Sequence, residues 1–103
     1  MSLAMAIITA PKENADSLAG GIVERKLGAC VQVVSGAQST FMWQGKVEQE
    51  EESLLLVKTK TELQDELVAY LDEAHPYDVP ELVLFPIAGG HKDYLEWMEE
   101  SLG

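Results

Sequence analysis

Residues 53–59 constrain the fold more than any other segment of this 103-residue chain. They contain Leu54-Leu55-Leu56-Val57, a run of four apolar side chains without alternation. Successive side chains of a strand point to opposite faces of its sheet, so a strand of this kind is apolar on both faces. The run therefore predicts a strand whose two faces are both buried, and the other elements must supply the cover.

The remaining segments alternate between strand and helix signals. Apolar side chains at helical spacing indicate the helices, and short apolar runs bounded by Pro or Gly indicate the strands. In chain order we expect a strand at 4–10, a helix at 15–27, a strand at 29–34 that resumes at 40–43, the strand at 53–59, a helix at 61–74, a strand at 81–88 and a short helix at 93–102.

Cap and turn residues mark several of these boundaries. We expect Asn14 to be the N-cap of the first helix and Gly28 to be its left-handed C-terminal residue. Thr61-Glu62-Leu63-Gln64 matches the capping box of the second helix, and Gln44-Gly45 predicts a hairpin turn. Gly20-Gly21 weakens the middle of the first helix, so it predicts close packing against another element.

This order of elements predicts a single α+β domain, ferredoxin-like (β-α-β-β-α-β) with an antiparallel sheet and a C-terminal helix, over residues 1–103. Residues 1–3 are left out of the fold because a second methionine, Met5, makes them a candidate cloning remnant. Right-handed crossovers place both long helices on one face of the sheet. The other face is then bare apart from the terminal helix, and the second and fourth strands are open edges.

The bare face is the reason to expect an oligomer. Apolar side chains expected to add to it are Val31, Val33, Phe41, Trp43, Leu82, Leu84 and Phe85. A closed ring of identical subunits hides both an apolar face and open edges. We therefore expect a homo-oligomer, with a trimer as the preferred arrangement.

Charge excludes some classes of partner. Seven basic and eighteen acidic residues give a formal charge of −11, which argues against binding to nucleic acid or to an anionic membrane surface. No segment approaches the roughly 20 apolar residues of a membrane span, and no signal peptide is recognised. The single cysteine, Cys30, rules out an internal disulfide. These features favour a cytoplasmic protein.

Three residues at element ends are candidates for metal binding. Cys30 begins the second strand, His75 ends the second helix and Glu81 begins the last strand. Thiolate, imidazole and carboxylate together suit copper or zinc. The spacing matches no metal motif, which favours the structural alternative of a buried cysteine, a helix-terminal histidine and an acid at a strand end.

Other residues carry weaker signals. His91 is a candidate loop ligand, and the glutamates at 48 and 50–52 are a candidate cation surface, although solvent exposure explains both more simply. Four aromatic residues can stack on a ligand or pack in the core or an interface: Trp43, Tyr77, Tyr94 and Trp97. The chain has no phosphate-binding glycine loop and no serine nucleophile elbow, so we expect no enzyme activity.

Five segments together resemble the CutA divalent-ion tolerance family. The resemblance covers residues 6–100, and the run at 75–81 is its most specific part. The segments are Gly28-Ala29-Cys30-Val31, Trp43-Gln44-Gly45-Lys46-Val47, the stretch from Glu51 to Thr59, His75-Pro76-Tyr77-Asp78-Val79-Pro80-Glu81-Leu82, and Tyr94-Leu95-Glu96-Trp97.

The resemblance implies compact trimers of ferredoxin-like subunits, a role in tolerance to divalent metals and binding of Cu(II). It also implies that the metal ligands are Cys30, His75 and Glu81. Animal relatives under the same name are linked to acetylcholinesterase anchoring, to which nothing in this chain points. The chain departs from the family at Gln32, where asparagine is common, and at Phe41, where tyrosine is usual.

Two other functions remain open. A trimeric sensor similar to the PII signalling proteins would bind a small molecule between subunits, with Tyr77, Trp43 and Lys58 as contacts. The chain has no long loop of the kind such sensors use for partners, which makes this function less favoured. A purely structural interaction module would bind neither metal nor metabolite.

Overall fold

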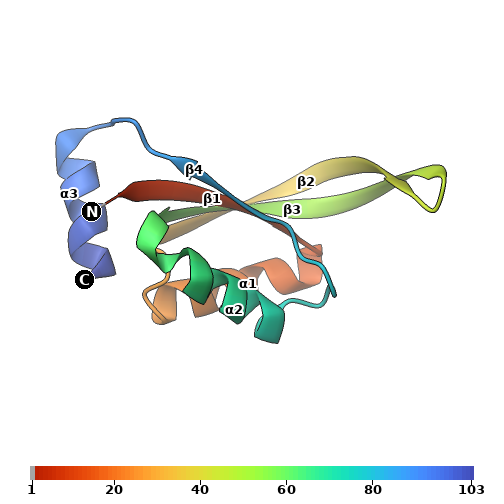
Figure 1. Cartoon of the computed structure of the whole chain (residues 1–103), viewed down its shortest axis with the longest axis horizontal. Coiled ribbons are helices and arrows are strands. Elements are labelled where there is room, and N and C mark those ends of the chain that lie inside the picture. The colour runs from red at the N-terminus through yellow and green to blue at the C-terminus, as the bar shows by residue number, and fades with distance from the viewer. Residues whose placement is uncertain (1) are drawn as a thin grey trace.

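Four antiparallel strands form one sheet in the order β2-β3-β1-β4 (Figure 1). The computed structural model describes residues 2–103. The elements in chain order are β1 (Leu3–Ala10), α1 (Lys12–Glu24), β2 (Cys30–Trp43), β3 (Lys46–Lys60), η1 (Thr61–Leu63), α2 (Gln64–Ala74), β4 (Leu82–Pro86) and α3 (Lys92–Leu102). The ferredoxin-like order and the open edges at β2 and β4 are confirmed. Met1 lies outside the described residues, and Leu3, which the sequence reasoning left aside, belongs to β1.

The position of β3 explains its apolar run. This strand pairs with β2 on one side and β1 on the other, so it lies inside the sheet. Leu55 and Val57 are fully buried on the face that α1 and α2 cover, while Leu54 and Leu56 are half-buried on the opposite face. The prediction that both faces of this strand are buried is therefore confirmed only for the helix-covered face of one chain, since the opposite face is half-buried.

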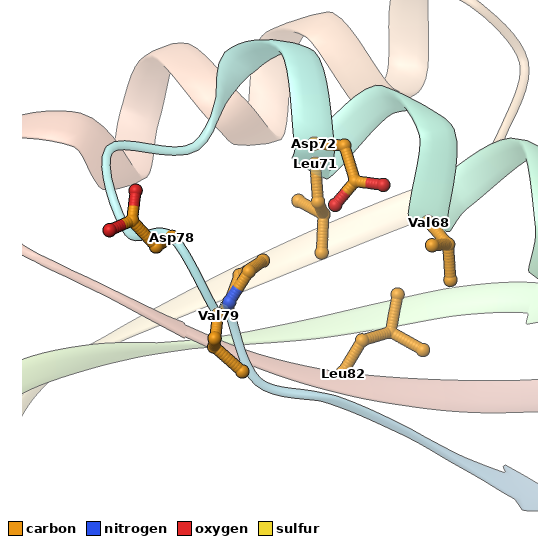
Figure 2. A pocket seen from close by; sticks show the side chains of 7 residues that line it. Val68, Leu71, Asp72, Asp78, Val79 and Leu82 are labelled. Carbon is orange, nitrogen blue, oxygen red and sulfur yellow. The ribbon is translucent and has the colours of Figure 1, made fainter.

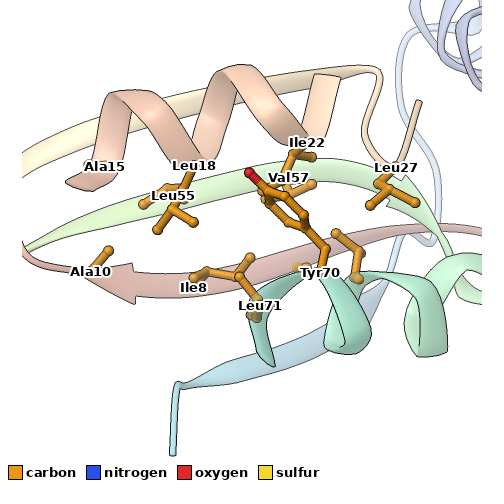
Figure 3. Close-up of a cluster of buried hydrophobic side chains, with 12 residues drawn as sticks. Ile8, Ala10, Ala15, Leu18, Ile22, Leu27, Leu55, Val57, Tyr70 and Leu71 are labelled. Carbon is orange, nitrogen blue, oxygen red and sulfur yellow. The ribbon is translucent and has the colours of Figure 1, made fainter. Parts of the chain in front are cut away.

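The helices α1 and α2 pack side by side on one face of the sheet, and the core lies between the two layers (Figure 3). Their close approach depends on Gly21, because a Cβ at this position would overlap the hydroxyl of Tyr70 on α2. Gly20 has open space around it. The expected close packing is therefore confirmed at Gly21 alone. Arg25 lies over the Tyr70 ring, with its Cζ atom 4.6 Å from the ring centre.

Three cap predictions are wrong, two of them at helix starts. Helix α1 begins directly after Pro11, so Asn14 lies inside the first turn and caps nothing with its side chain. Proline is favoured near a helix start because its fixed φ suits the helix and its missing N–H costs no bond there. Thr61 starts the short turn η1 instead of a capping box, and its hydroxyl bonds to Glu62.

The third wrong prediction concerns the C-terminal end of α1. The left-handed residue is Lys26, with φ of 57°, and not Gly28. Gly28 is needed for a different reason, since a Cβ there would come within 2.8 Å of Val57 and 3.0 Å of Ile22. The glycine therefore allows the chain to pass close to β3 after the helix ends.

Strands β2 and β3 continue far beyond the helices as a hairpin arm, residues 37–52 (Figure 1). The two expected pieces of the second strand are one strand with a bulge between Val34 and Ala37. The turn at Gln44-Gly45 is confirmed, with both residues at positive φ, 50° and 79°. The arm exposes large apolar side chains near its tip, including Met42 and Trp43, which are 65% and 61% exposed.

The face of the sheet opposite α1 and α2 is largely bare, and we call it the open face. Its apolar side chains are Met5, Ile7, Val34, Leu54, Leu56, Val83 and Phe85. Helix α3 lies at the end of the sheet near Leu3, apart from the other helices, and buries Met98 there (Figure 1). Val34, Val83 and Phe85 remain 44–47% exposed.

The open face has a different set of residues from the one expected. Val31, Val33, Leu82 and Leu84 pack against the helix-covered core, and only Phe85 of the expected β4 residues lies on the open face. Alternation along a strand separates two sets of side chains but does not say which set the helices cover. Among residues 2–103, no helix combines the length and the apolar character needed to cross a membrane.

Candidate functional site

The three predicted metal ligands lie at two different ends of the sheet. His75 follows α2 and Glu81 precedes β4, and both contact Thr9 near the end of β1. The His75 Nε2 atom is 2.8 Å from the Thr9 carbonyl oxygen, and the Thr9 hydroxyl donates to Glu81 Oε1 at 3.4 Å. Cys30 begins β2 at the opposite end.

The distance between the two ends can be estimated from the strand register. Cys30 is opposite Lys58, which is opposite Met5, and Met5 precedes Thr9 by four residues on the same strand. At about 3.3 Å per residue, four residues place Cys30 about 13 Å from the His75 end along the strand direction. Zinc-type ligands lie only about 2.0–2.3 Å from the ion. One subunit therefore does not bring the three side chains together, and residues 2–103 contain no group of three His, Cys, Asp or Glu that can hold an ion.

His75 is buried, with 7% of its surface exposed, and both ring nitrogens are occupied. The backbone N–H of Tyr77 donates to Nδ1 at 3.1 Å, so Nδ1 accepts and Nε2 carries the proton that bonds to the Thr9 carbonyl. This arrangement fixes one neutral tautomer. A metal ion at Nδ1 would have to displace the Tyr77 N–H.

Tyr77 connects this loop to the base of the hairpin arm. Its hydroxyl donates to Glu52 Oε2 at 2.9 Å, and its ring packs against His75 at 4.8 Å between centres. Burial, followed by the hydrogen bond to Glu52 and the nearby negative charges of Glu52, Glu50 and Glu13, raises the pKa of Tyr77 to about 12. The phenol is therefore a proton donor held in place by a carboxylate.

Glu52 is the site residue that sequence reasoning misplaced. The acidic stretch was expected in solvent, which is correct for residues 48–51 but wrong for Glu52, whose side chain is only 7% exposed. The available signal was position, because Glu52 directly precedes Ser53 and the apolar run of β3. Thr9 gave no comparable signal, since its contacts with His75 and Glu81 span more than 60 residues.

Cys30 and Glu81 are more accessible than His75. Cys30 is a half-buried free thiol on the open face, and Glu81 is exposed. Beside Cys30, the Lys58 Nζ atom donates to Gln32 Oε1 at 2.8 Å. Gln32, where the family commonly has asparagine, therefore lies close to Cys30. The shorter side chain of asparagine would place the amide oxygen that accepts from Lys58 at a different point.

The remaining candidates are exposed in the single chain. His91 is exposed at the start of α3 and makes no side-chain cap. Trp43, Tyr94 and Trp97 are also exposed, so none of them is a core residue of one subunit. Tyr94 and Trp97 stack on each other on α3 at 5.5 Å between ring centres. Burial in a subunit interface stays a prediction for these aromatic residues.

A cavity of about 220 Å³ lies beside the 75–81 loop, between α2 and the residues that lead into β4 (Figure 2). It contains two carboxylates and is otherwise apolar, and neither histidine nor cysteine lines it. The lining residues are Val68, Leu71, Asp72, Asp78, Val79, Pro80 and Leu82. The cavity is therefore separate from the predicted metal ligands.

Comparison with known proteins decides the family. The family model described as "CutA1 divalent ion tolerance protein" matches residues 4–101, nearly the whole chain. The chain belongs to the CutA1 family. The resemblance found in the sequence motifs is thus confirmed.

Three relatives of this CutA1 chain illustrate the match. "Divalent-cation tolerance protein CutA" of Pectobacterium atrosepticum is 43% identical over 97 residues, which cover 93% of this chain and 88% of the relative. "Protein CutA 1, chloroplastic" of rice is 45% identical over 95 residues and 91% of this chain, which spans 54% of the rice protein. The solved structure of the "Divalent cation tolerance protein (Cut A1)" from Thermus thermophilus gives a TM-score of 0.94 at 43% identity, covering 98% of this chain and 99% of the other. Because the rice relative is named as chloroplastic, CutA1 membership does not fix a cytoplasmic location.

Proposed function

We propose that this CutA1 chain binds divalent cations as a homotrimer and contributes to tolerance of metal ions by binding, without catalysing a reaction. The observation that carries the proposal is its membership of a family described by divalent ion tolerance. Its curated relatives carry the same description in their names. The cytoplasm is the proposed location, since a lone free thiol suits a reducing compartment.

The surface of one subunit supports the oligomer. An apolar open face, two open sheet edges and the exposed apolar tip of the hairpin arm are surfaces that a soluble monomer rarely leaves uncovered. Identical subunits related by rotational symmetry can pack such surfaces against one another and so remove them from water. The number three rests on the family resemblance.

For the metal we propose Cu(II), held by Cys30, His75 and Glu81. The three ligand types, thiolate, imidazole and carboxylate, suit copper, but the three side chains are too far apart in one chain. The proposed site is therefore shared, with Cys30 of one subunit near the His75 and Glu81 end of another. His75 would exchange its Tyr77 hydrogen bond for the ion, whereas Glu81 is already accessible.

Copper titration by calorimetry tests this assignment. Cys30→Ser and Glu81→Gln alter accessible side chains and are expected to weaken Cu(II) binding without unfolding the chain, while His91→Ala serves as the matched control. Equal copper affinity for all four proteins would reject the ligand set. Mass measurement in solution at micromolar concentration tests the trimer separately, and a monomer would reject it.

The alternative of a small-molecule sensor is favoured by one observation. A second cavity lies between α3 and the open face and includes Lys58, one of the three contacts expected for a sensor, although Tyr77 and Trp43 do not line it. A thermal-shift screen of metabolites tests sensing, and stabilisation by metals alone would count against it.

A further inference from the structure

A cavity of about 270 Å³ lies where α3 packs over one end of the open face. Strands β1, β3 and β4 form its floor, α3 forms one wall, and the segment before α3 forms its rim. The lining residues are Met5, Lys58, Phe85, Pro86, Ile87, Gly89, Gly90, His91, Tyr94, Leu95 and Met98. Most of this lining is apolar, as in pockets that bind small organic molecules.

The charge of this cavity is opposite to that of the chain. Eighteen of the 103 residues are acidic and seven are basic, yet no acidic residue lines the cavity and one lysine does. The cavity beside α2, by contrast, contains the acidic side chains Asp72 and Asp78. The cavity under α3 therefore carries a basic side chain and no acidic one, in contrast to the chain as a whole.

Lys58 is the group that gives the cavity its charge. Its side chain is half-buried, and within residues 2–103 its only side-chain hydrogen bond is to Gln32 Oε1, at 2.8 Å. A lysine ammonium has three N–H donors and forms stronger bonds to carboxylates than to neutral amides. Lys58 lines the cavity and pairs with Met5 on β1, while its ammonium bonds to Gln32 on β2, so the charge sits at the β2 side of an apolar space.

We propose that this cavity binds a small amphipathic monocarboxylate, with the carboxylate on Lys58 Nζ and the apolar body against Phe85, Leu95 and Met98. His91 at the rim offers a second hydrogen-bond donor. The volume lies just below the range of ligand pockets, about 300–1,000 Å³, and therefore suits an aromatic or branched aliphatic acid better than a nucleotide. This inference goes beyond cation binding and does not depend on it.

Methionine methyl groups provide a direct probe of the site. Met5 and Met98 line the cavity, whereas Met42 is exposed on the hairpin arm. In the intact protein carrying ¹³C-methyl methionine, benzoate is expected to shift the Met5 and Met98 signals and to leave Met42 unchanged. Benzyl alcohol, which has the same ring without the charge, is the matched ligand control. Shifts confined to Met42, or none at millimolar benzoate, would overturn the proposal.

A pair of lysine variants tests the role of charge. Lys58→Met keeps an apolar stem of similar shape and is expected to weaken benzoate binding about tenfold, the factor that a hydrogen bond to a charged group supplies. Lys60→Met, two residues further along β3 and outside the cavity, is expected to bind benzoate normally. Equal binding of benzoate and benzyl alcohol, or no change in Lys58→Met, would show an apolar cavity only and would reject a carboxylate site. Benzoate titration of Glu81→Gln, which alters a proposed metal ligand at the other end of the sheet, is expected to match the wild type and separates this result from the metal proposal.

Discussion

The hydrogen bond between Tyr77 and Glu52 is the contact whose removal tests the site most directly. It joins the loop that carries His75 and Glu81 to the base of the hairpin arm. Tyr77→Phe removes the hydroxyl and keeps the ring that packs against His75. Glu52, which is 7% exposed, then keeps a buried charge without this donor.

The expected cost follows from that burial. Hydrogen bonds to charged groups contribute about 1.5–3 kcal/mol, and a buried charged acceptor left without its donor loses at least that much. We therefore expect Tyr77→Phe to lower the free energy of unfolding by about 2 kcal/mol. Glu52→Gln keeps an acceptor for the phenol and removes the charge, so the double variant Tyr77→Phe/Glu52→Gln is expected to be more stable than the sum of the two single changes predicts.

Urea unfolding at one fixed protein concentration measures these differences, because the stability of an oligomer depends on concentration. Tyr94→Phe is the matched control, since Tyr94 is exposed on α3 and its hydroxyl makes no side-chain hydrogen bond within residues 2–103. A loss below about 0.5 kcal/mol for Tyr77→Phe, or strict additivity in the double variant, would refute the buried charged contact.

Three further outcomes are expected from the described contacts. Spectroscopic titration should show one tyrosine ionising near pH 12, and this transition should vanish in Tyr77→Phe. Because the pKa rises from 10.0 to about 12 on folding, its stabilising effect is complete below pH 10 and is lost as the pH rises through 12. Gly20→Ala should stabilise α1 by about 1 kcal/mol, whereas Gly21→Ala, which meets Tyr70, should destabilise the protein in thermal unfolding. Lys26→Gly should raise stability by about 1 kcal/mol, because it relieves a left-handed lysine; a fall in the unfolding midpoint would contradict this.

The order of the elements follows from the sequence because it depends on patterns that are local. The unalternating run from Leu54 to Val57 identifies an interior strand, and Gln44-Gly45 identifies the turn before it. The sequence does not show which face of the sheet the helices cover, because the alternation in β2 is the same whether Val31 or Gln32 faces them. The helix-start prediction failed for a related reason, because Asn14 and Pro11 lie close together and both residue types occur near helix starts.

In the candidate site too, the sequence predicts local features better than contacts between residues far apart in the chain. The loop at 75–81 is one continuous motif, so its importance is visible in the sequence. Its partners are not, because Thr9 comes from the first strand and Glu52 from the third. The position of Cys30 becomes clear only from the strand register, which places it at the other end of the sheet.

Because Cys30 lies far from His75 and Glu81 in one chain, the proposed copper site couples metal binding to subunit assembly. If the three proposed ligands meet only between subunits, a cation bound there stabilises the oligomer, and the oligomer must raise cation affinity by the same factor. Cu(II) is then expected to shift dissociation of the wild-type oligomer to lower protein concentration, and Cys30→Ser is expected to abolish the shift. His91→Ala, outside the proposed ligand set, should keep it. A copper affinity that does not change as the protein is diluted into monomers would place the cation within one chain and would reject a shared centre.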